Sequence, residues 1–460
     1  MRSERCRKRP SQVYCVLGSA RSSAIGRSVL SIIGAGSFAY YTVKDRLPQI
    51  LTKVIDTIHR NKKKFFEEYG KEGVEAEKKA ISIFSKLRNE MQTNKPILPL
   101  TDNCQDTDIW NQYLDYQKTL LGNGEDPSWF RSPWLYVECY LYRRIQEGMS
   151  FSPPISEYDV FRDVKNESFF QSQQAMMALC THLQELKKTI ASLSKEQRQE
   201  EFYRLLQVSL WGNKCDLSIS GGQDNSQKSS ILASLESLKS FILVNNMDSL
   251  WNTLTKGKDV GSENALKTRV DIVLDNAGFE LVTDFILADA ILFFNLATEV
   301  HFHGKCIPWF VSDTTKHDFD WTIQQFLAVN HKWMSKCGQT WKENLKKGSW
   351  VYHENLFWTL PHEFWSMEKI APDLYTELKK SDLIFFKGDL NYRKLTGDRK
   401  WDFTVPFSQA LKTFHPAPLC SIRTLKADIQ VGLQAGIGER LSASDANWMV
   451  SGKYGVIQFS

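Results

Sequence analysis

Residues 270–280 read VDIVLDNAGFE, and this short segment joins an apolar run to the beginning of a helical stretch. The run Val270–Leu274 has the length and apolar composition of a buried strand. Asp275 and Asn276 follow where the strand ends, and Gly278 permits a tight turn because it has no Cβ atom. The segment therefore predicts a strand, a polar turn and a helix in immediate succession.

Short apolar runs alternate with helical stretches throughout the region after residue 265. Such alternation predicts an α/β fold, with a mainly parallel sheet flanked by helices in a Rossmann-like three-layer arrangement. In these sheets, ligands bind beyond the carboxyl ends of the strands, near a topological switch point. The predicted strands are Val270–Leu274, Glu299–Phe302, Trp309–Val311, Leu383–Phe386 and Leu419–Ile422, and the predicted helices include Phe279–Phe294 and Trp321–Val329.

The preceding part of the chain, from Tyr40 to about residue 215, is mainly helical in pattern. Apolar residues between Ile81 and Met91 recur at spacings of three and four, which is typical of an amphipathic helix. Polar segments without periodicity predict loops at Ser218–Ser230 and Gly257–Asn264. The predicted organisation is a basic, disordered leader at 1–36, a helical domain at 37–230, and an α/β domain at 231–460 that carries the metal-binding residues described below.

The charge of the chain is concentrated in its first residues. The chain has 460 residues and a net charge of +5, but residues 1–35 contain seven Lys and Arg against one acid, which leaves 51 basic and 52 acidic residues elsewhere. A nucleic-acid-binding protein carries its basic surface on the folded domain. The longest apolar run, Ile286–Leu296, is interrupted by Asp289 and Asn295 and is too short for a membrane span. We therefore expect neither nucleic acid nor membrane as a partner.

The cysteines and the leader bear on the compartment. The nine cysteines are scattered without a CxxC pair, and no signal peptide with a cleavage site is evident. Both observations favour free thiols in the cytoplasm, and access to the nucleus is a further expectation. The Arg- and Ser-rich leader also has the composition of a mitochondrial transit peptide. A disordered leader without a targeting role is favoured, because residues 2–27 show little amphipathic periodicity.

Polar clusters follow four of the predicted strand ends. A single Asp after a strand is more often a helix N-cap than a ligand, but clusters at one sheet edge would converge. Carboxylates and an amide without His or Cys suit Mg²⁺ or Mn²⁺, and neighbouring guanidinium and ammonium groups suit a phosphate ester. The pattern therefore indicates phosphoryl chemistry. The expected cluster comprises Asp275, Asn276, Glu280, Asp313 and Asp389, with Arg393, Arg423 and Lys426 nearby.

Four segments in this order resemble the signature motifs of the damage-control phosphatases. They are LDNAGFE at 274–280, the pair Ser312-Asp313, KGDLNYR at 387–393 and RTLK at 423–426. The last is similar to the RTxK motif of the sugar-phosphate subfamily. The resemblance extends from about Ser37 to Phe459 and includes WGNKCD at 211–216.

The resemblance implies a metal-dependent hydrolase of small phosphorylated metabolites, such as fructose 1-phosphate and fructose 6-phosphate. It implies a divalent metal, manganese, cobalt, nickel or magnesium, held by Asp275, Asn276 and Asp313. The residues it implies as substrate contacts are Asp275, Asn276, Glu280, Asp389, Leu390, Asn391, Tyr392, Arg393, Arg423 and Lys426.

We expect Asp275, Asp389 and Lys426 to carry the catalysis, by one of two routes. A metal would neutralise phosphoryl oxygens and orient an attacking water, while Lys426, with Arg393 or Arg423, would stabilise the transferring group. Asp389 would protonate the leaving oxygen. Alternatively, Asp275 would attack directly and form an aspartyl-phosphate. The sequence leaves both routes open.

Two other functions compete with this hypothesis. The resemblance also carries an S-adenosylmethionine-dependent carboxyl methyltransferase that acts on glutamate side chains of a protein substrate, although the turn after Val270–Leu274 suits a metal better than a methyl donor. A non-catalytic partner-binding protein is the third possibility, and the intact motifs argue against it. Two imidazoles at His301 and His303 could bind zinc, but with no third ligand in register, strand packing is the favoured interpretation. The aromatic stretch Leu356–Trp365 is favoured as core or pocket wall.

Overall fold

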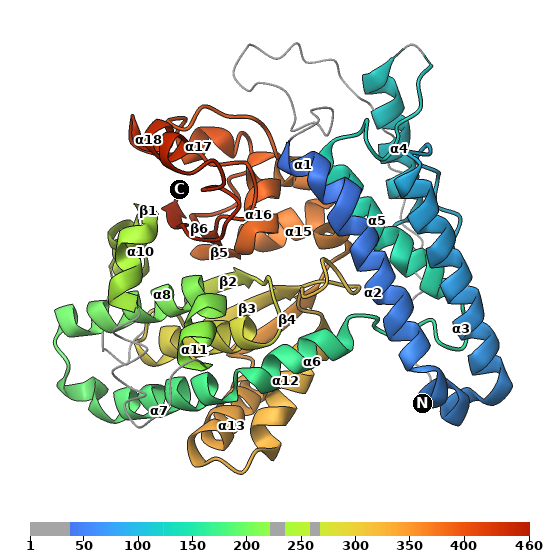
Figure 1. Cartoon of the computed structure of the whole chain (residues 1–460). Helices are drawn as coiled ribbons and strands as arrows, with labels where there is room; N and C mark the ends of the chain where they lie inside the picture. Colours follow the sequence, from blue (N-terminus) through green and yellow to red (C-terminus); the bar gives the residue numbers. More distant parts are fainter. Residues whose placement is uncertain (1–36, 123, 221–234, 258–266) are drawn as a thin grey trace.

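A seven-stranded mixed sheet forms the centre of the computed structural model, which describes residues 37–122, 124–220, 235–257 and 267–460 (Figure 1). The strand order is β1-β7-β6-β5-β2-β3-β4, and every neighbouring pair is parallel except β6 and β7. The predicted parallel α/β sheet is therefore confirmed. The strands are β1 (Ile242–Asn245), β2 (Arg269–Val273), β3 (Glu299–Gly304), β4 (Trp350–Glu354), β5 (Leu383–Lys387), β6 (Leu419–Thr424) and β7 (Gly455–Phe459).

The chain changes direction across the sheet beside β2. From β2 it proceeds to β3 and β4 on one side, and then returns to place β5 against the other side of β2. The carboxyl ends of β2 and β5 therefore border a topological switch point, where open α/β sheets bind their ligands. Helix α11 (Phe279–Phe293) follows β2 and helix α16 (Gly388–Thr396) follows β5, so the loops between them are positioned for chemistry.

Helices cover both faces of the sheet, and each face has its own hydrophobic core. Ile272 and Phe302 pack toward one core, while Val273 and Phe386 pack toward the other, as the alternation of side chains along a strand requires. The first core includes α7 (Gln173–Thr189), α8 (Lys195–Ser220), α10 (Met247–Thr255), α11, α12 (Lys316–Ala328) and α13 (Lys332–Lys347). The second core includes the other helices near the sheet, α14 (Met367–Ile370), α15 (Pro372–Leu378), α16 and α17 (Phe407–Ala410).

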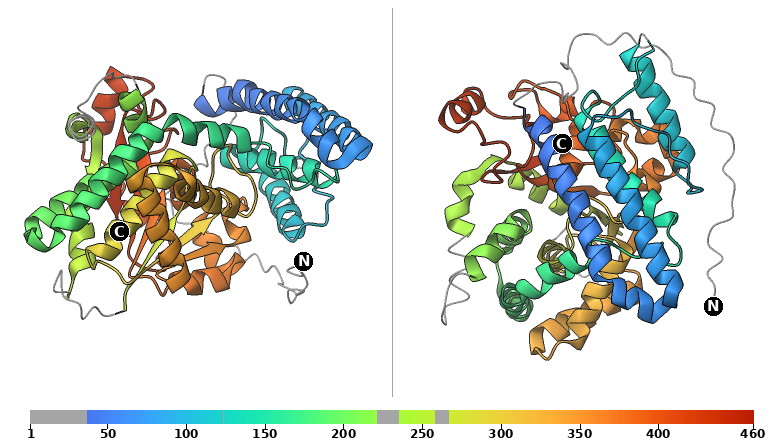
Figure 2. Two further views of the ribbon diagram at one scale, coloured as in Figure 1. Left: turned by 90° about the horizontal axis from the view of Figure 1, so that it is seen from below. Right: turned by 45° about the vertical axis from the view of Figure 1, so that its right-hand side comes forward.

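The N-terminal helices form a layer beside the second core (Figures 1 and 2). This layer contains two long helices, α2 (Leu47–Arg60) and α3 (Lys62–Gln92), which pack against each other, and α5 (Trp134–Ser150), whose residues are almost all buried. Helices α7 and α8, which also precede residue 230, instead cover the opposite face of the sheet. The predicted domain boundary at residue 230 stays a prediction. The remaining helices are α1 (Phe38–Tyr41), the π-helix η1 (Thr42–Arg46), α4 (Thr107–Leu121), α6 (Arg162–Gln171) and α18 (Ile437–Ser444).

The structure corrects three details of the predicted elements. Trp309–Val311 was expected as a strand but lies in turns, with φ of +44° at Phe310 and +71° at Val311. Strands β1, β4 and β7 were not predicted. Helix α8 continues to Ser220, so the first three residues of the predicted loop at Ser218–Ser230 are helical. The rest of that loop, the leader at 1–36 and most of the loop at Gly257–Asn264 lie outside the described residues.

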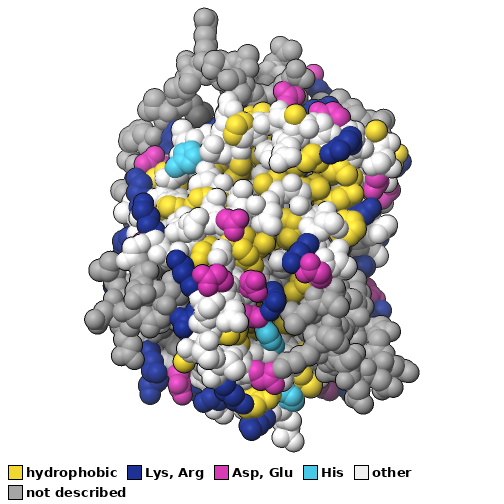
Figure 3. Space-filling view, turned by 90° about the vertical axis from the view of Figure 1, so that its left-hand side faces the viewer, with side chains coloured by type: hydrophobic (Ala, Val, Ile, Leu, Met, Phe, Trp, Pro, Cys, Tyr) yellow, Lys and Arg dark blue, Asp and Glu magenta, His cyan; other side chains and the backbone are white. Residues whose placement is uncertain are grey.

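The described surface agrees with the balanced charge of the folded region. Basic and acidic side chains are interspersed on the face shown in Figure 3. Within the described part of the chain, no helix is both long and apolar enough to span a membrane.

Candidate functional site

The loops after β2 and β3 are joined by backbone hydrogen bonds. The amide of Thr314 donates to the carbonyl oxygen of Asp275 at 2.8 Å, and the amide of Ala277 donates to the carbonyl oxygen of Ser312 at 2.7 Å. Asn276 and Asp313 are partners in an isolated antiparallel bridge. The three predicted metal ligands, Asp275, Asn276 and Asp313, are therefore adjacent although they are distant in the sequence.

The side chains of this group form a negatively charged, mostly buried cluster. Burial raises the pKa of Asp275 well above its usual range, and the nearby carboxyl groups of Glu280 and Asp313 raise it further. Burial also raises the pKa of Asp313 to about 6, against the opposing charge of Lys305. Asn276 Nδ2 donates to Asp275 Oδ2 and to Glu280 Oε2, both at 2.8 Å. A cation at this position would relieve the repulsion between these groups.

The donor atoms of the cluster fit a divalent metal that prefers oxygen. Asp275 and Asp313 offer carboxylate oxygens, and Asn276 offers its amide oxygen, which also accepts a hydrogen bond from Ser312 Oγ. Asp313 Oδ2 is buried, and its partner among the described residues is the ammonium group of Lys305 at 3.2 Å. This single partner leaves acceptor capacity on the carboxylate, which a metal could use.

Gly388 brings the beginning of α16 directly against Asp275. A Cβ atom at Gly388 would lie 1.9 Å from Asp275 Oδ2, and the φ of +81° is one that residues with a Cβ atom rarely adopt. The next residue, Asp389, points its carboxylate toward β6, where Oδ1 accepts from Arg423 Nε at 2.8 Å and from the amide of Lys426 at 3.1 Å. The motif after β5 is therefore built for close approach to the β2 loop.

Two cavities meet at this cluster, with volumes of about 140 and 200 Å³. Both are lined by Asp275, Asp389 and Lys426, the three residues expected to carry the catalysis. The side chain of Lys426 is exposed and makes no hydrogen bond or ion pair with another described residue. Of the other predicted site residues, Asn276, Asp313, Leu390 and Arg393 line the smaller cavity and Glu280 lines the larger one.

Three predicted substrate contacts differ from the expectation, because their polar groups are engaged by the protein. The guanidinium of Arg423 is fully buried, donates to the carbonyl oxygens of Ile429 and Ala427, and lies 4.1 Å from the ring centre of Tyr392. The hydroxyl of Tyr392 accepts from an amide at 3.2 Å, and Asn391 Nδ2 donates to Lys387 O at 2.8 Å. These side chains lie outside both cavity linings and hold the loops that shape the site.

A buried lysine beneath the site was not identified from the sequence. Lys387 Nζ donates to Asp284 Oδ1 at 2.8 Å and to the carbonyl oxygen of Ser209 at 2.8 Å, and it lies 3.6 Å from Glu280 Oε1. Burial alone would lower the pKa of Lys387, but Asp284 and Glu280 outweigh it and raise that pKa. The ammonium group therefore stays charged and fixes two helices against the strand end. The feature of the sequence that could have identified Lys387 is its position as the first residue of the KGDLNYR motif.

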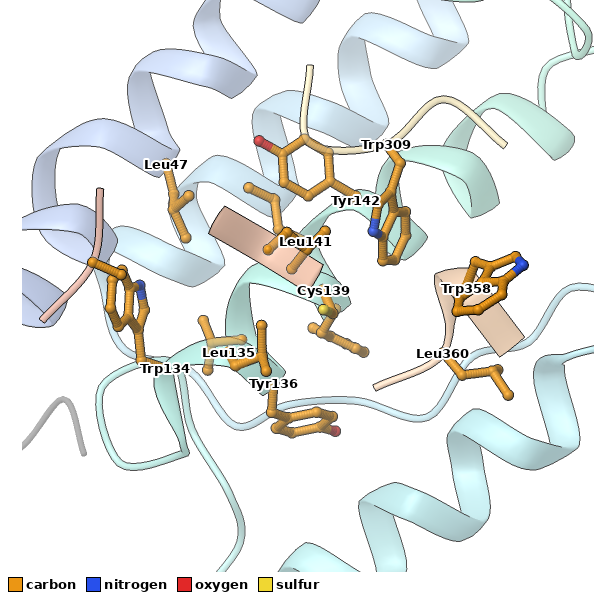
Figure 4. Close-up of a cluster of buried hydrophobic side chains, with 14 of the residues drawn as sticks. Leu47, Trp134, Leu135, Tyr136, Cys139, Leu141, Tyr142, Trp309, Trp358 and Leu360 are labelled. Atoms are coloured by element: carbon orange, nitrogen blue, oxygen red, sulfur yellow. The ribbon is translucent and has the colours of Figure 1, made fainter. Parts of the chain in front are cut away.

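The N-terminal helices also line the smaller cavity, and sequence reasoning did not find these residues. Figure 4 shows Leu47 from α2 and Trp134 and Tyr142 from α5, all within the cluster of buried side chains. The guanidinium of Arg393 lies 3.8 Å from the ring centre of Trp134 and donates to Glu138 Oε2 at 2.5 Å. The helical residues that line this cavity are Arg46, Leu47, Ile50, Trp134, Glu138 and Tyr142.

A second group of possible metal ligands combines His301 of β3, His353 of β4 and Glu377 of α15. Their ligand atoms are within 4.8 Å of one another, and of the predicted pair only His301 belongs to this group, because His303 is bonded to Asp271. However, His301 Nδ1 and His353 Nε2 share a hydrogen bond of 2.8 Å. The two oxygens of Glu377 bind Arg269 at 2.5 Å and Lys380 at 2.6 Å. Because both oxygens of Glu377 are engaged by basic side chains, and because the Asp275 cluster borders two cavities at the strand ends, the Asp275 cluster is the better candidate for the metal.

Comparisons with known proteins agree with the motifs. A family model described as the damage-control phosphatase ARMT1-like domain matches residues 42–441. A protein of Xenopus laevis named damage-control phosphatase ARMT1 is 74% identical over 431 residues, which cover 94% of this chain and 98% of the relative. The Homo sapiens protein of the same name is 63% identical over 437 residues, which cover 95% and 99%.

Among solved structures, the chain is similar to a DUF89 family protein from Pyrococcus horikoshii, with a TM-score of 0.39 and 13% identity over 78% of this chain and 91% of that one. This likeness is too low to support an inference. The family model and the relatives, in contrast, extend over nearly the whole chain. The chain therefore belongs to the damage-control phosphatase ARMT1-like family.

Proposed function

We propose that the chain hydrolyses small phosphorylated metabolites with the help of a divalent metal, and that sugar phosphates such as fructose 1-phosphate and fructose 6-phosphate are its substrates. The convergence of Asp275, Asn276 and Asp313 with Lys426 on one pair of cavities carries this proposal. Membership of the damage-control phosphatase family supports the reaction class.

The metal would be held by the carboxylates of Asp275 and Asp313 and the amide oxygen of Asn276. When bound, it supplies positive charge to the phosphoryl oxygens and lowers the pKa of water. The oxygen donors favour manganese or magnesium, and cobalt and nickel are further candidates. Lys305, beneath Asp313, holds that carboxylate in place through its ion pair at 3.2 Å.

The chain's own residues would bind and orient the phosphoryl group. Lys426 places an ammonium group beside Asp275 at the junction of the cavities, where it stabilises negative charge on the transferring group. Asp389 lies at the same junction, where Arg423 fixes its carboxylate, and we assign it the transfer of a proton to the leaving oxygen because of this position. The choice between attack by water and attack by Asp275 remains open in this proposal.

The test is phosphate release from a panel of sugar phosphates with Mn²⁺, Mg²⁺ or EDTA. We expect metal-dependent release by the wild type and at least a 1000-fold loss in Asp275→Asn, as expected when a group essential to the transition state is removed. Circular dichroism would show whether the variant is folded. Near wild-type turnover by a folded Asp275→Asn protein would refute the assignment.

The methyltransferase alternative is tested in parallel with labelled S-adenosylmethionine and a protein substrate. No feature of the described residues favours it, because the turn after β2 is occupied by the acidic cluster and not by a glycine-rich loop. Chelator-insensitive methyl transfer without phosphate release would replace the phosphatase proposal.

We also propose a cytoplasmic location, with access to the nucleus. Free thiols support a reducing compartment, and none of the cysteines whose side chains the structure describes forms a disulfide. Fluorescence microscopy of the tagged full chain would test this proposal, and accumulation in mitochondria would contradict it.

A further inference from the structure

We propose that the N-terminal helices read the hydroxyl groups of the substrate, with Glu138 as the main hydrogen-bond acceptor and Arg46 as a donor on the same cavity. This recognition would make the enzyme prefer phosphorylated polyols to phosphate esters without hydroxyl groups. The inference rests on the proposed phosphatase function and concerns the part of the substrate that does not react.

The smaller cavity has two chemically different walls. One wall carries Asp275, Asp313 and Lys426 from the strand ends, and these groups suit a metal and a phosphoryl group. The other wall comes from η1, α2 and α5 and carries Arg46 and Glu138 between apolar side chains. A phosphorylated metabolite bound at the first wall would extend its carbon chain toward the second.

Glu138 is a buried carboxylate that is held rigidly and has acceptor capacity left. Its Oε2 accepts from Arg393 Nη1 at 2.5 Å, and Arg393 is itself fixed by Asp398 and by the ring of Trp134. No described residue donates a hydrogen bond to Oε1, although the residue is only 5% exposed. Glu138 lines the cavity, so this oxygen is free to accept a hydrogen bond there, and a sugar hydroxyl can donate one.

Arg46 provides the complementary donors. It ends the π-helix η1, an element that frequently occurs at functional sites, and its exposed guanidinium forms no ion pair or hydrogen bond with another described residue. A hydroxyl group both donates and accepts hydrogen bonds, so a carboxylate and a guanidinium on one wall satisfy both of its capacities. Phosphoryl binding by Arg46 is the competing role.

The experiment compares two substrates in the presence of Mn²⁺, fructose 1-phosphate and p-nitrophenyl phosphate, which has no hydroxyl group. For Glu138→Gln we expect kcat/KM for the sugar phosphate to fall about 10- to 100-fold, chiefly through KM, and the value for the nitrophenyl ester to fall far less. For Arg46→Gln we expect a smaller loss with the same preference. Lys44→Gln is the matched control, because Lys44 is an exposed cation of η1 outside the cavity lining.

The outcomes separate the possible roles. Equal losses on the two substrates, in either variant, would show that the residue serves the phosphoryl group or the structure and would overturn the inference. Unchanged kinetics with the sugar phosphate would overturn it as well. If Glu138→Gln fails to fold, the kinetics of Arg46→Gln, a substitution at an exposed residue, decide between these roles. A wild type that releases no phosphate from either substrate would instead refute the proposed function.

Discussion

Replacing Gly388 by Ala tests how closely the loop after β5 must approach Asp275. The new Cβ atom would lie 1.9 Å from Asp275 Oδ2 and 2.1 Å from its Cγ. The carboxylate would have to withdraw by about 1.5 Å to reach an ordinary contact of 3.4 Å. The residue would also keep a φ of +81°, which costs a non-glycine residue about 1 kcal/mol.

The steric contact with Asp275 and the backbone strain at Gly388 together set the expected loss of stability. Overpacking in a buried region costs about 1–3 kcal/mol, so the total loss of unfolding free energy should be about 2–4 kcal/mol. A displacement of about 1 Å at a reacting group costs about 100-fold in rate, and we expect at least that loss of kcat/KM. The measurements are urea unfolding, manganese binding by calorimetry, and phosphate release.

Gly348→Ala is the matched control, because it separates backbone strain from the contact with Asp275. Gly348 ends α13 with a φ of +77°, and a Cβ atom there would meet nothing within 4 Å. This variant should lose about 1 kcal/mol of stability and no activity. If Gly388→Ala lost no more stability than the control and retained its turnover, the proposed tight packing of α16 against Asp275 would be wrong.

Two further predictions concern buried ionisable groups. Lys387→Met removes the partner of Asp284, and we expect it to lower the unfolding free energy, measured in urea, by about 3–5 kcal/mol. The control Lys379→Met removes an exposed ion pair and should cost less than about 1 kcal/mol, so equal losses would contradict the role of Lys387. Burial lowers the pKa of both His301 and His353 to about 4, below the value of about 6.5 in an unfolded chain. The unfolded chain therefore binds more protons between these values, so stability should be lost as the pH falls from about 6.5 to 4. Thermal unfolding across this range should show a flatter slope for His353→Phe than for wild type, and parallel curves would contradict the assignment.

Local patterns in the sequence were sufficient to predict the strands that carry the site. In β2 and β5, an apolar run, a glycine turn and a buried helix follow one another within a few residues. The expected strand at Trp309–Val311 was wrong because burial, and not strand geometry, produced its apolar composition: Trp309 is fully buried in a turn. Strand β4 was missed because it reads Trp-Val-Tyr-His-Glu at the sheet edge, without a continuous apolar run.

The sequence alone could not distinguish charged residues that face the predicted site from those that are buried and hold its loops. Arg423 and Lys426 belong to the same motif, yet one guanidinium is surrounded by carbonyl oxygens and the other side chain is exposed at both cavities. The difference arises from the loop at 427–431, whose carbonyl groups fold back onto Arg423. No spacing rule contains that information, because it depends on where the loop returns.

The contribution of the N-terminal helices was invisible for a related reason. Arg393 and Glu138 are 255 residues apart, and neither lies in a pattern that identifies the other as its partner. Yet their contact joins the motif after β5 to α5, so the wall that faces the Asp275 cluster is built from a segment without catalytic motifs. We expect the strand ends to provide charges for phosphoryl transfer, whereas discrimination among phosphate esters requires contacts to the rest of the substrate. Around the smaller cavity the helices before residue 150 offer such contacts, while α8 and residues 451–452 border the larger one, so the proposed reading of hydroxyl groups predicts that the substrate extends into the smaller cavity.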